Sequence, residues 1–448
     1  MKQSVDKNDF VYGVAMAAHQ IEGAYLEDGK GESIWDVFGH VAGNIKHGDT
    51  ADVSCDHYHR YKEDVALMAE LGIGAYRLSI SWPRILPEGV GEVNKEGVDF
   101  YNRLIDELLL NGIEPYITLF HWDLPQKLFE RGGFLSPEMP SWFYNYAKVV
   151  GSAFGDRVKK FITINEPQCI MASYNKSTHA PNLKYNMRDQ LTVAHTLLKS
   201  HGMALKALRE VVPGVQIGYA PAGEVACPAD ESPEARETAR RAYFSISKTN
   251  PASSVSLFSD PIFFGDYPSE YYEKFADSLP DIDPEDFKLI SQPLDFYCQN
   301  IYVGFTVGEV DGEYQADEYP GGFPRNALGW NIYPEAMYWS LKFLTERYGM
   351  PIYITENGMP NVDLISLDGK VHDPQRIDFI ERYLRQLERA KSEGVDVCGY
   401  FYWSLLDNFE WSHGYDARFG LVYVDYRTCE RIPKDSFYYY KERIRKRD

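Results

Sequence analysis

The sequence has few cysteines, and none of them form the groups that metal sites or disulfide frameworks need. There are six in 448 residues, they lie far apart, and no C-x-x-C pair occurs. This excludes a cysteine zinc site and a disulfide-stapled fold. Several stand in apolar runs, where a free thiol behaves as a small core residue. We therefore expect a reducing compartment, the cytoplasm. The cysteines are Cys55, Cys169, Cys227, Cys298, Cys398 and Cys429.

Long hydrophobic runs are also missing. No uninterrupted apolar stretch is long enough to span a bilayer. The first nine residues, Met1 to Asp9, have no apolar core of the kind that a secretory signal carries. We therefore expect no membrane partner, and a cytoplasmic location.

Positive charge is scarce. Lysine and arginine total 46 against 66 acidic residues, which gives a formal net charge of −20. Nucleic acids and anionic membranes bind basic surfaces, so this balance argues against both as partners. A neutral small molecule is compatible with it. The segment Gly29 to Ser33 lacks the spacing of a phosphate-binding loop. We expect no nucleotide, other cofactor or metal.

Linkers and low-complexity tracts are absent, so we predict a single domain over residues 1–448. Apolar runs rich in β-branched and aromatic residues alternate with segments of helical period, as in an α/β fold. Eight such alternations predict a (β/α)8 TIM barrel with elaborated βα loops. Helices are least defined over 223–295. Strands are expected at 11–17, 75–80, 114–120, 161–165, 215–220, 296–302, 351–356 and 397–403, and helices at 61–71, 98–110, 191–211 and 375–391.

Two glutamates end predicted strands in matching contexts. Glu166 follows Thr163-Ile164-Asn165, and Glu356 follows Ile354-Thr355. A charge at the end of a buried strand costs desolvation energy, so it needs a reason. The carboxyl ends of barrel strands meet at one rim, where paired carboxylates could cut a glycosidic bond. One such glutamate alone could instead cap a helix or pair with an arginine.

Other residues on the expected rim are polar or aromatic. Sugar hydroxyls need amides and carboxylates, and the apolar face of a pyranose stacks on a ring. Any one of these aromatics could simply pack in the core, since aromatics make up 15% of the chain. Their shared placement favours a sugar pocket. The set is Gln20, His121, Trp122, Asn300, Tyr302, Trp403, Glu410, Trp411 and Phe419.

At these residues the whole chain resembles glycoside hydrolase family 1, the β-glucosidase-like retaining β-glycosidases. Each motif alone is weak, but their order along a barrel is specific. They are Gln20-Ile21-Glu22-Gly23, Tyr76 to Arg84, Phe120-His121-Trp122-Asp123-Leu124-Pro125, Asn165-Glu166-Pro167, Asn300-Ile301-Tyr302, Thr355-Glu356-Asn357-Gly358, Trp403 to Trp411 and Arg418-Phe419-Gly420-Leu421.

The resemblance implies a role for each residue. Glu356 would be the nucleophile, and Glu166 the acid and then the base. Asn165 would hold the sugar 2-hydroxyl. Arg77 and Tyr302 would keep Glu356 ionised and lower its pKa, while that anion raises the pKa of Glu166. The family usually has a cis peptide at Trp403-Ser404. The remaining sugar contacts would come from Gln20, His121, Trp122, Asn300, Trp403, Glu410 and Trp411.

The chain departs from the family pattern on the leaving-group side. Gln168 stands where many relatives have tryptophan, and Met16 and His19 differ beside Gln20. The loop 177–182 keeps only part of the pattern. Trp330 is a candidate ring for the leaving group, or an ordinary packed tryptophan. The natural leaving group, the choice among glucose, galactose and fucose, and the oligomeric state all stay open.

We predict a retaining, exo-acting β-glycosidase, a β-glucosidase with some tolerance for β-galactosides, that acts on terminal β-D-glucosyl residues of a small-molecule β-glycoside through a covalent glycosyl-enzyme. A 6-phospho-β-glycosidase is disfavoured because Glu410 would repel a phosphate. A metal hydrolase using Asp52, Asp56, His57 and His59 is disfavoured because alternate residues on a helix face apart. A catalytically silent sugar-binding barrel would have lost a carboxylate, and both are present.

Overall fold

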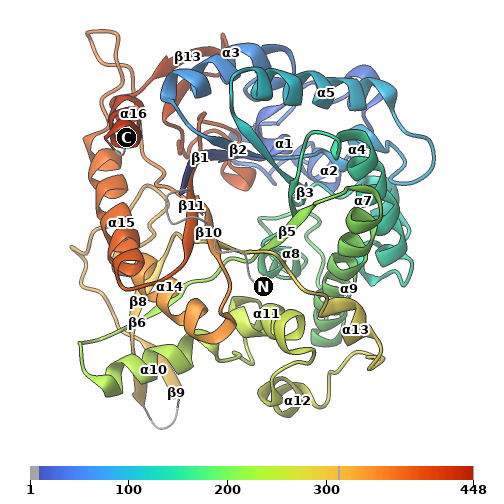
Figure 1. Ribbon diagram of the computed structural model, residues 1–448, viewed down its shortest axis with the longest axis vertical. Coiled ribbons are helices and arrows are strands. Elements are labelled where there is room, and N and C mark those ends of the chain that lie inside the picture. Colours follow the sequence, from blue (N-terminus) through green and yellow to red (C-terminus); the bar gives the residue numbers. More distant parts are fainter. Residues whose placement is uncertain (1–9, 311–312, 447–448) are drawn as a thin grey trace.

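A computed structural model describes residues 10–310 and 313–446, and its centre is an eight-stranded parallel barrel (Figure 1). The residues on which the absence of a signal segment was argued, 1–9, lie outside the described part. Neighbouring strands follow the order β5-β4-β3-β2-β1-β11-β10-β7. The strands are β1 (Val11–Met16), β2 (Ala75–Ser79), β3 (Glu114–Phe120), β4 (Lys160–Asn165), β5 (Gln216–Ala220), β7 (Tyr297–Asn300), β10 (Ile352–Asn357) and β11 (Val397–Trp403).

The seam between β5 and β7 is joined by backbone hydrogen bonds. The N–H of Asp295 donates to the carbonyl of Ile217 at 3.0 Å, and the N–H of Asn300 donates to that of Pro221 at 3.1 Å. The two end strands of the sheet therefore meet, as they must when a sheet closes on itself. The predicted (β/α)8 architecture is confirmed.

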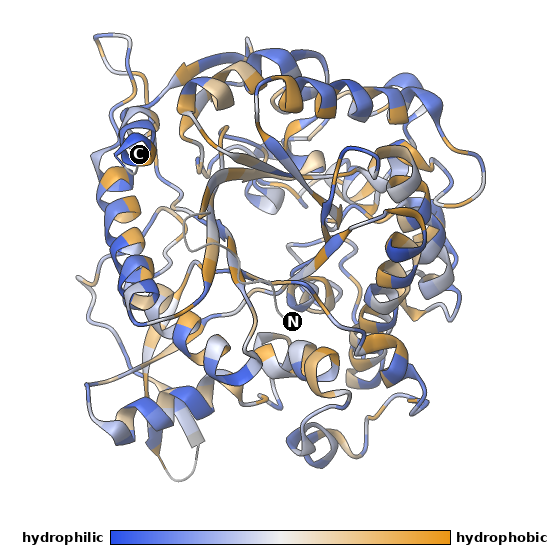
Figure 2. Ribbon diagram, viewed as in Figure 1, coloured by the Kyte–Doolittle hydropathy of each residue, from blue (hydrophilic) through white to orange (hydrophobic). Residues whose placement is uncertain are grey.

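Helices surround the barrel and bury one face each against it. In Figure 2 the outer helices show hydrophobic residues on one side and hydrophilic residues on the other, while the strands are mostly apolar. The helices are α1 (Ala18–Ile21), α2 (Ile34–Gly39), α3 (His57–Leu71), α4 (Trp82–Ile85), α5 (Lys95–Leu110), α6 (Gln126–Glu130), α7 (Met139–Phe154), α8 (Pro167–Ser173), α9 (Met187–Val211), α10 (Pro233–Phe244), α11 (Val255–Phe264), α12 (Ser269–Phe275), α13 (Asp286–Ile290), α14 (Glu335–Tyr348), α15 (Pro374–Ser392) and α16 (Asp435–Arg445).

The predicted elements fall close to those observed. Every predicted strand lies within two residues of its observed bounds, and the four predicted helices correspond to α3, α5, α9 and α15. Three of them begin three or four residues earlier than predicted. Their first turns are polar, so the apolar periodicity starts only in the second turn.

The segment that the sequence left undefined, 223–295, contains four helices and the first strand of a small second sheet. The sheet has the order β6-β8-β9, and it is formed by β6 (Val225–Pro228), β8 (Gly304–Val310) and β9 (Glu313–Ala316). Helices α10 to α13 lie in the same part of the chain, at the lower edge of Figure 1. This insertion stands beside the carboxyl ends of β5 and β7. A hairpin of β12 (Val422–Asp425) and β13 (Glu430–Pro433) follows the last barrel strand.

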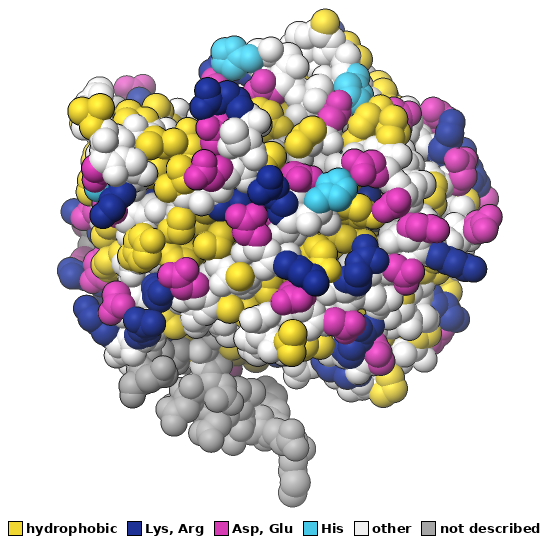
Figure 3. Space-filling view, turned by 90° about the horizontal axis from the view of Figure 1, so that it is seen from above, with side chains coloured by type: hydrophobic (Ala, Val, Ile, Leu, Met, Phe, Trp, Pro, Cys, Tyr) yellow, Lys and Arg dark blue, Asp and Glu magenta, His cyan; other side chains and the backbone are white. Residues whose placement is uncertain are grey.

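The surface carries both signs of charge. In Figure 3, acidic and basic side chains are interspersed over the visible face, with hydrophobic groups between them. Within residues 10–310 and 313–446, no helix combines the length and the apolar character that crossing a membrane would need.

Candidate active site

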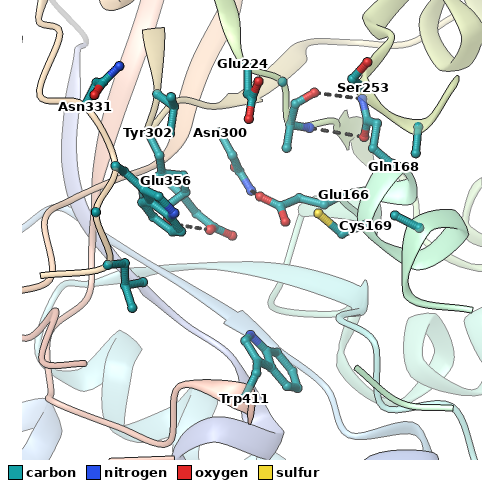
Figure 4. Close-up of a pocket in the computed structure, with 18 of the residues that line it drawn as sticks. Glu166, Gln168, Cys169, Glu224, Ser253, Asn300, Tyr302, Asn331, Glu356 and Trp411 are labelled. Carbon is teal, nitrogen blue, oxygen red and sulfur yellow. Dashed lines mark hydrogen bonds between the residues drawn. The ribbon is translucent and has the colours of Figure 1, made fainter. Parts of the chain in front are cut away.

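Glu166 and Glu356 line the same cavity at the carboxyl end of the barrel. The cavity measures about 780 Å³. Glu166 directly follows β4, and Glu356 is the penultimate residue of β10. Their exposed fractions are only 7% and 3%. Figure 4 shows both carboxylates reaching into the space between the two strands. The strand ends therefore bring together the pair that the sequence singled out.

The backbone at Glu166 turns sharply so that its side chain enters this cavity. Its φ and ψ are 46° and 67°, in the left-handed region that few non-glycine residues occupy. Its N–H donates to the carbonyl of Ala220 at 2.7 Å, which fixes the turn against β5. Pro167 then starts α8, where its fixed φ suits the first helical position. Held strain of this kind is frequent at functional sites.

Glu356 is held by a buried arginine and a tyrosine. One of its oxygens accepts from Nη1 of Arg77 at 2.5 Å, and the other accepts from the hydroxyl of Tyr302 at 2.8 Å. Arg77 is itself fixed, because its Nε donates to Oγ1 of Thr118 at 3.0 Å and its Nη2 to Oδ1 of Asn165 at 2.6 Å. These contacts orient the carboxylate and favour its ionised form.

The side-chain amides of Asn165 and Asn300 link Arg77, the partner of Glu356, to Glu166. Nδ2 of Asn300 donates both to Oε1 of Glu166, at 2.8 Å, and to Oδ1 of Asn165, at 3.1 Å. Nδ2 of Asn165 lies 3.0 Å from Nε2 of His121. Burial and the nearby Arg77 hold the pKa of His121 well below its usual range, so the ring is neutral. Its Nε2 therefore accepts from Asn165, and its proton resides on Nδ1.

The two carboxyl groups have different electrostatic surroundings. Burial, and next the charge of Glu356, raises the pKa of Glu166 to about 7. The expected lowering of the pKa of Glu356 was wrong: burial outweighs its partners, and the net direction is upward. Arg77 and Tyr302 offset part of that rise. Within the described residues Glu166 forms no ion pair, and its side chain contacts the neutral amide of Asn300 and the thiol of Cys169. The pair still separates into a more acidic and a less acidic member.

A third carboxyl group, Glu410, faces the same cavity from the loop after β11. Burial, and then the charge of Glu356, raises the pKa of Glu410 to about 8. Nε2 of Gln20 donates to Glu410 at 3.2 Å and to the carbonyl of Phe409 at 2.9 Å. The buried Oε1 of Gln20 has no partner among the described residues. Glu410 and Gln20 thus offer a cluster of polar atoms suited to ligand hydroxyls.

Two groups of aromatic rings form walls of the cavity. Trp411 packs against Trp122, with ring centroids 4.6 Å apart. Trp330 lies 5.7 Å from Tyr302 and 6.2 Å from Phe419, measured between centroids. All five residues line the cavity. Trp330 is therefore part of the cavity wall, and it also packs against the other rings of its group.

The peptide bond between Trp403 and Ser404 is cis, as the resemblance implied. Gly358 approaches this segment so closely that a Cβ atom on it would lie 1.8 Å from the carbonyl oxygen of Trp403. Only glycine fits there. The turn after Glu356 is thus packed directly on the chain that carries Trp403 into the cavity.

Eleven of the fourteen predicted site residues line this one cavity, and the other three contact those that do. Gln20 touches Glu410, Asn165 touches Asn300, and Arg77 touches Glu356. The lining residues are His121, Trp122, Glu166, Asn300, Tyr302, Trp330, Glu356, Trp403, Glu410, Trp411 and Phe419.

Sequence reasoning missed one side of the cavity. Gln168, Cys169 and Glu224 line it beside Glu166, as Figure 4 shows. Asn250, Ser253, Asp317 and Arg325 complete this side. Most of them come from the insertion of 223–295 and from the loops around β9. The place of Gln168, two residues after Glu166, was the only sequence signal for this wall.

The residues considered for a metal site are engaged elsewhere. His57 and His59 are the first and third residues of α3. Nδ1 of His57 lies 2.7 Å from Asp64, and Nδ1 of His59 lies 2.6 Å from Asp56. Over residues 10–310 and 313–446, no group of three potential metal-binding side chains occurs.

Known proteins share this architecture over the whole chain. The family model for glycosyl hydrolase family 1 matches residues 2–448. Beta-glucosidase A of Thermotoga maritima is 44% identical over 439 residues, which are 97% of each chain. Beta-glucosidase A of Acetivibrio thermocellus is 45% identical over 446 residues, 98% of this chain and 97% of the relative. A solved structure of the Thermotoga maritima beta-glucosidase in complex with glucoimidazole superposes with a TM-score of 0.91 at 44% identity, covering 99% of this chain and 100% of that one. The chain belongs to glycosyl hydrolase family 1.

Proposed function

We propose that this glycoside hydrolase is a retaining, exo-acting β-glucosidase, which releases terminal β-D-glucosyl residues by double displacement. The observation that carries the proposal is the pair Glu166 and Glu356, two buried carboxyl groups on one cavity in unlike environments. Close relatives named beta-glucosidase support it. A pair flanking one anomeric carbon is the arrangement that retaining glycosidases use.

In the first step the carboxylate of Glu356 attacks the anomeric carbon and forms an ester bond. The bond to the leaving oxygen breaks, and that oxygen takes the proton from Glu166. The pKa of about 7 leaves a large fraction of Glu166 protonated near neutral pH, so a proton is available. Arg77 and Tyr302 hold the attacking oxygen atoms in place. A leaving group with a basic oxygen departs only with this proton.

In the second step water attacks the same carbon. Esterification has removed the charge of Glu356, which is one of the causes that raise the pKa of Glu166. Glu166 then acts as a base and takes a proton from the water. The ester bond breaks, Glu356 regains its charge, and glucose leaves with its original β configuration.

The sugar would be held by the polar cluster opposite Glu166. We assign Gln20 and Glu410 to sugar hydroxyls, because the Oε1 of Gln20 is buried without a partner and Glu410 faces the cavity. His121 and Asn165 would bind hydroxyls nearer the anomeric carbon. Trp403 and Trp411 would stack on the sugar, and Trp122, Tyr302, Asn300 and Phe419 would complete its surroundings. Trp330 lies on the path of the leaving group.

The alternatives are less well supported. A phosphorylated sugar needs free cations, but Arg418 on the loop after β11 pairs with Asp407 at 2.7 Å, and Lys434 pairs with the same residue at 2.6 Å. The carboxyl group of Glu410 faces the cavity instead. A sugar-binding protein without catalysis would not need the left-handed backbone turn at Glu166, which places this carboxyl group in the same buried cavity as the charge of Glu356.

We further propose that residues 1–448 form one catalytic domain and that the protein is cytoplasmic. The barrel strands come from the whole length of the chain, from β1 to β11, which supports the first point. All six cysteines are free, as thiols are in a reducing compartment.

The stereochemistry of hydrolysis tests this function. Wild-type enzyme is mixed with an aryl β-glucoside, and the first sugar formed is followed by proton NMR before it mutarotates. We expect the β anomer to appear first. The α anomer as first product would refute the retaining mechanism, and no hydrolysis of any β-glucoside would refute the enzyme class. Parallel assays with β-galactoside, β-fucoside and 6-phospho-β-glucoside define the sugar preference.

A further inference from the structure

The segment from Ala220 to Val225 forms a rigid wall beside Glu166. It is tied to the end of β7 and to the residues that follow this strand: the N–H of Asn300 donates to the carbonyl of Pro221 at 3.1 Å, and the N–H of Val225 donates to that of Val303 at 3.0 Å. The N–H of Glu166 adds a bond to Ala220 at 2.7 Å. The wall is thus fixed to the end of β7 and to the turn that carries Glu166.

The side chain of Gln168 makes a fourth attachment of the wall, and this uses the amide groups with which it could otherwise bind a ligand. Its Nε2 donates to the carbonyl of Ala222 at 2.8 Å, and its Oε1 accepts from the N–H of Ala222 at 3.2 Å, as the dashed lines in Figure 4 show. Its amide therefore shapes the wall and has little left for a ligand. Gln168, which stands where many relatives have tryptophan, therefore holds the backbone of Ala222 in place.

Glu224 is the one charged residue of this wall. It lines the cavity, and its side chain is exposed. Figure 4 places it between Asn331 and Ser253, on the side of Glu166 away from Trp411. Within the described residues its carboxylate forms no ion pair or hydrogen bond, unlike Arg325, whose Nε donates to Asn331 at 3.2 Å. Its charge is thus available to a molecule that enters.

The position of Glu224 relates it to the leaving group. Glu166 supplies the proton to the leaving oxygen in the proposed mechanism, so a leaving group extends from Glu166 toward this wall. The sugar itself would lie on the opposite side, near Glu410. Five acidic residues line the cavity, Glu166, Glu224, Asp317, Glu356 and Glu410, against the two cations Lys176 and Arg325. The pKa values of about 7 for Glu166 and about 8 for Glu410 leave these two carboxyl groups largely or partly protonated near neutral pH, so they add little negative charge. Selection by charge on the leaving-group side therefore depends on Glu224.

We propose that Glu224 is a specificity-determining residue that selects leaving groups by charge, favouring cationic ones, such as those with an ammonium group, over anionic ones. This inference rests on the proposed β-glucosidase function. An exposed carboxylate contributes about as much as one member of a surface ion pair, so we expect a preference of about two- to fivefold in kcat/KM. The effect is screened by salt.

The test uses three aryl β-glucosides whose phenols carry different charges on a saturated chain: tyramine, p-ethylphenol and p-hydroxyphenylpropanoate. The saturated chain keeps the charge from changing the reactivity of the phenol. The measured quantity is the ratio of kcat/KM for the tyramine glucoside to that for the propanoate glucoside. We expect this ratio to exceed one in the wild type, to fall toward one in Glu224→Gln, and to fall in the wild type in about 0.5 M NaCl.

Glu231→Gln is the matched control. Glu231 is exposed on the same connection to α10, lies outside the cavity lining, and loses the same charge on substitution. Its ratio should equal that of the wild type. An equal ratio in the wild type and in Glu224→Gln, or a wild-type preference for the anionic glucoside, would overturn the proposal. If instead the wild type hydrolyses none of the three, including the neutral glucoside, the proposed function fails and not the charge selection alone.

Discussion

Replacing Arg77 by methionine should change the pH at which Glu356 becomes an effective nucleophile. Arg77 is the only cation in contact with Glu356 among the described residues, and it is almost fully buried. Methionine fills a similar volume but brings no charge. Glu356 would keep Tyr302 as a donor at 2.8 Å, while burial continues to raise its pKa. The protonated, unreactive form would then be favoured further.

The size of the effect follows from the burial of the pair. Removing one partner of a buried ion pair costs about 3–5 kcal/mol, because the other charge is left without compensation. At about 1.36 kcal/mol for each pKa unit, even the lower figure corresponds to a rise of about two units in the pKa of Glu356. We therefore expect kcat/KM to fall by up to roughly a hundredfold on the acid side of the wild-type profile, and by less at higher pH. Because the carboxyl group ionises above its pKa, activity should recover as the pH rises.

The assay measures kcat/KM against pH with dinitrophenyl β-glucoside. This leaving group needs no proton from Glu166, so the acid limb of the profile reports the nucleophile with little contribution from the general acid. In Arg77→Met the acid limb should move to higher pH. Arg431→Met is the control, since Arg431 forms a buried pair with Asp64 at 2.8 Å outside the cavity. It should lower the melting temperature and leave the profile in place. An acid limb unchanged in Arg77→Met would refute the assigned role of Arg77.

Three further variants and one pH dependence of the wild type have defined outcomes. Glu166→Gln should cost roughly a hundredfold or more in kcat/KM for phenols of high pKa and much less for dinitrophenol, as a leaving-group series would show; a uniform loss would count against its role as acid. In the wild type, hydrolysis of the poor leaving groups should decline as the pH rises through the Glu166 pKa of about 7, because the acid is then ionised; a flat profile there would contradict the assignment. Gly358→Ala should destabilise the protein by about 1–3 kcal/mol, since the new Cβ would meet the Trp403 carbonyl, and an unchanged melting temperature would show that the contact relaxes freely. Lys434→Met should lower the free energy of unfolding in urea by about 3 kcal/mol, because two buried aspartates lose their shared partner; no change in the midpoint would argue against that account.

The sequence predicted the barrel well because its strands are buried on both faces. Such strands read as continuous apolar runs with sharp ends, and polar residues such as Glu166 and Glu356, although buried themselves, mark where the strands end. Helix starts were less accurate because the first turns of α3, α5 and α9 carry no apolar periodicity, even though His57 and Tyr58 of α3 are buried. The short helices α10 to α13 gave no clear period.

Local sequence patterns could not predict the wall on the leaving-group side or the direction of the pKa shift of Glu356. Gln168 contacts the backbone of Ala222, 54 residues further along the chain. The spacing of residues within a helix or strand cannot predict such a long-range contact. The upward direction of the pKa of Glu356 depends on how completely the barrel buries it. Its partners Arg77 and Tyr302 were predicted from the resemblance, but the amount of water around a carboxyl group is a property of the folded whole.

Trapping the glycosyl-enzyme tests the central claim most directly. The enzyme is treated with 2-deoxy-2-fluoro-β-glucosyl fluoride, digested, and the labelled peptide is sequenced by mass spectrometry. The account predicts one sugar per chain, attached to Glu356, and no label in Glu356→Gln. A sugar attached to another residue, or turnover without any covalent intermediate, would contradict it.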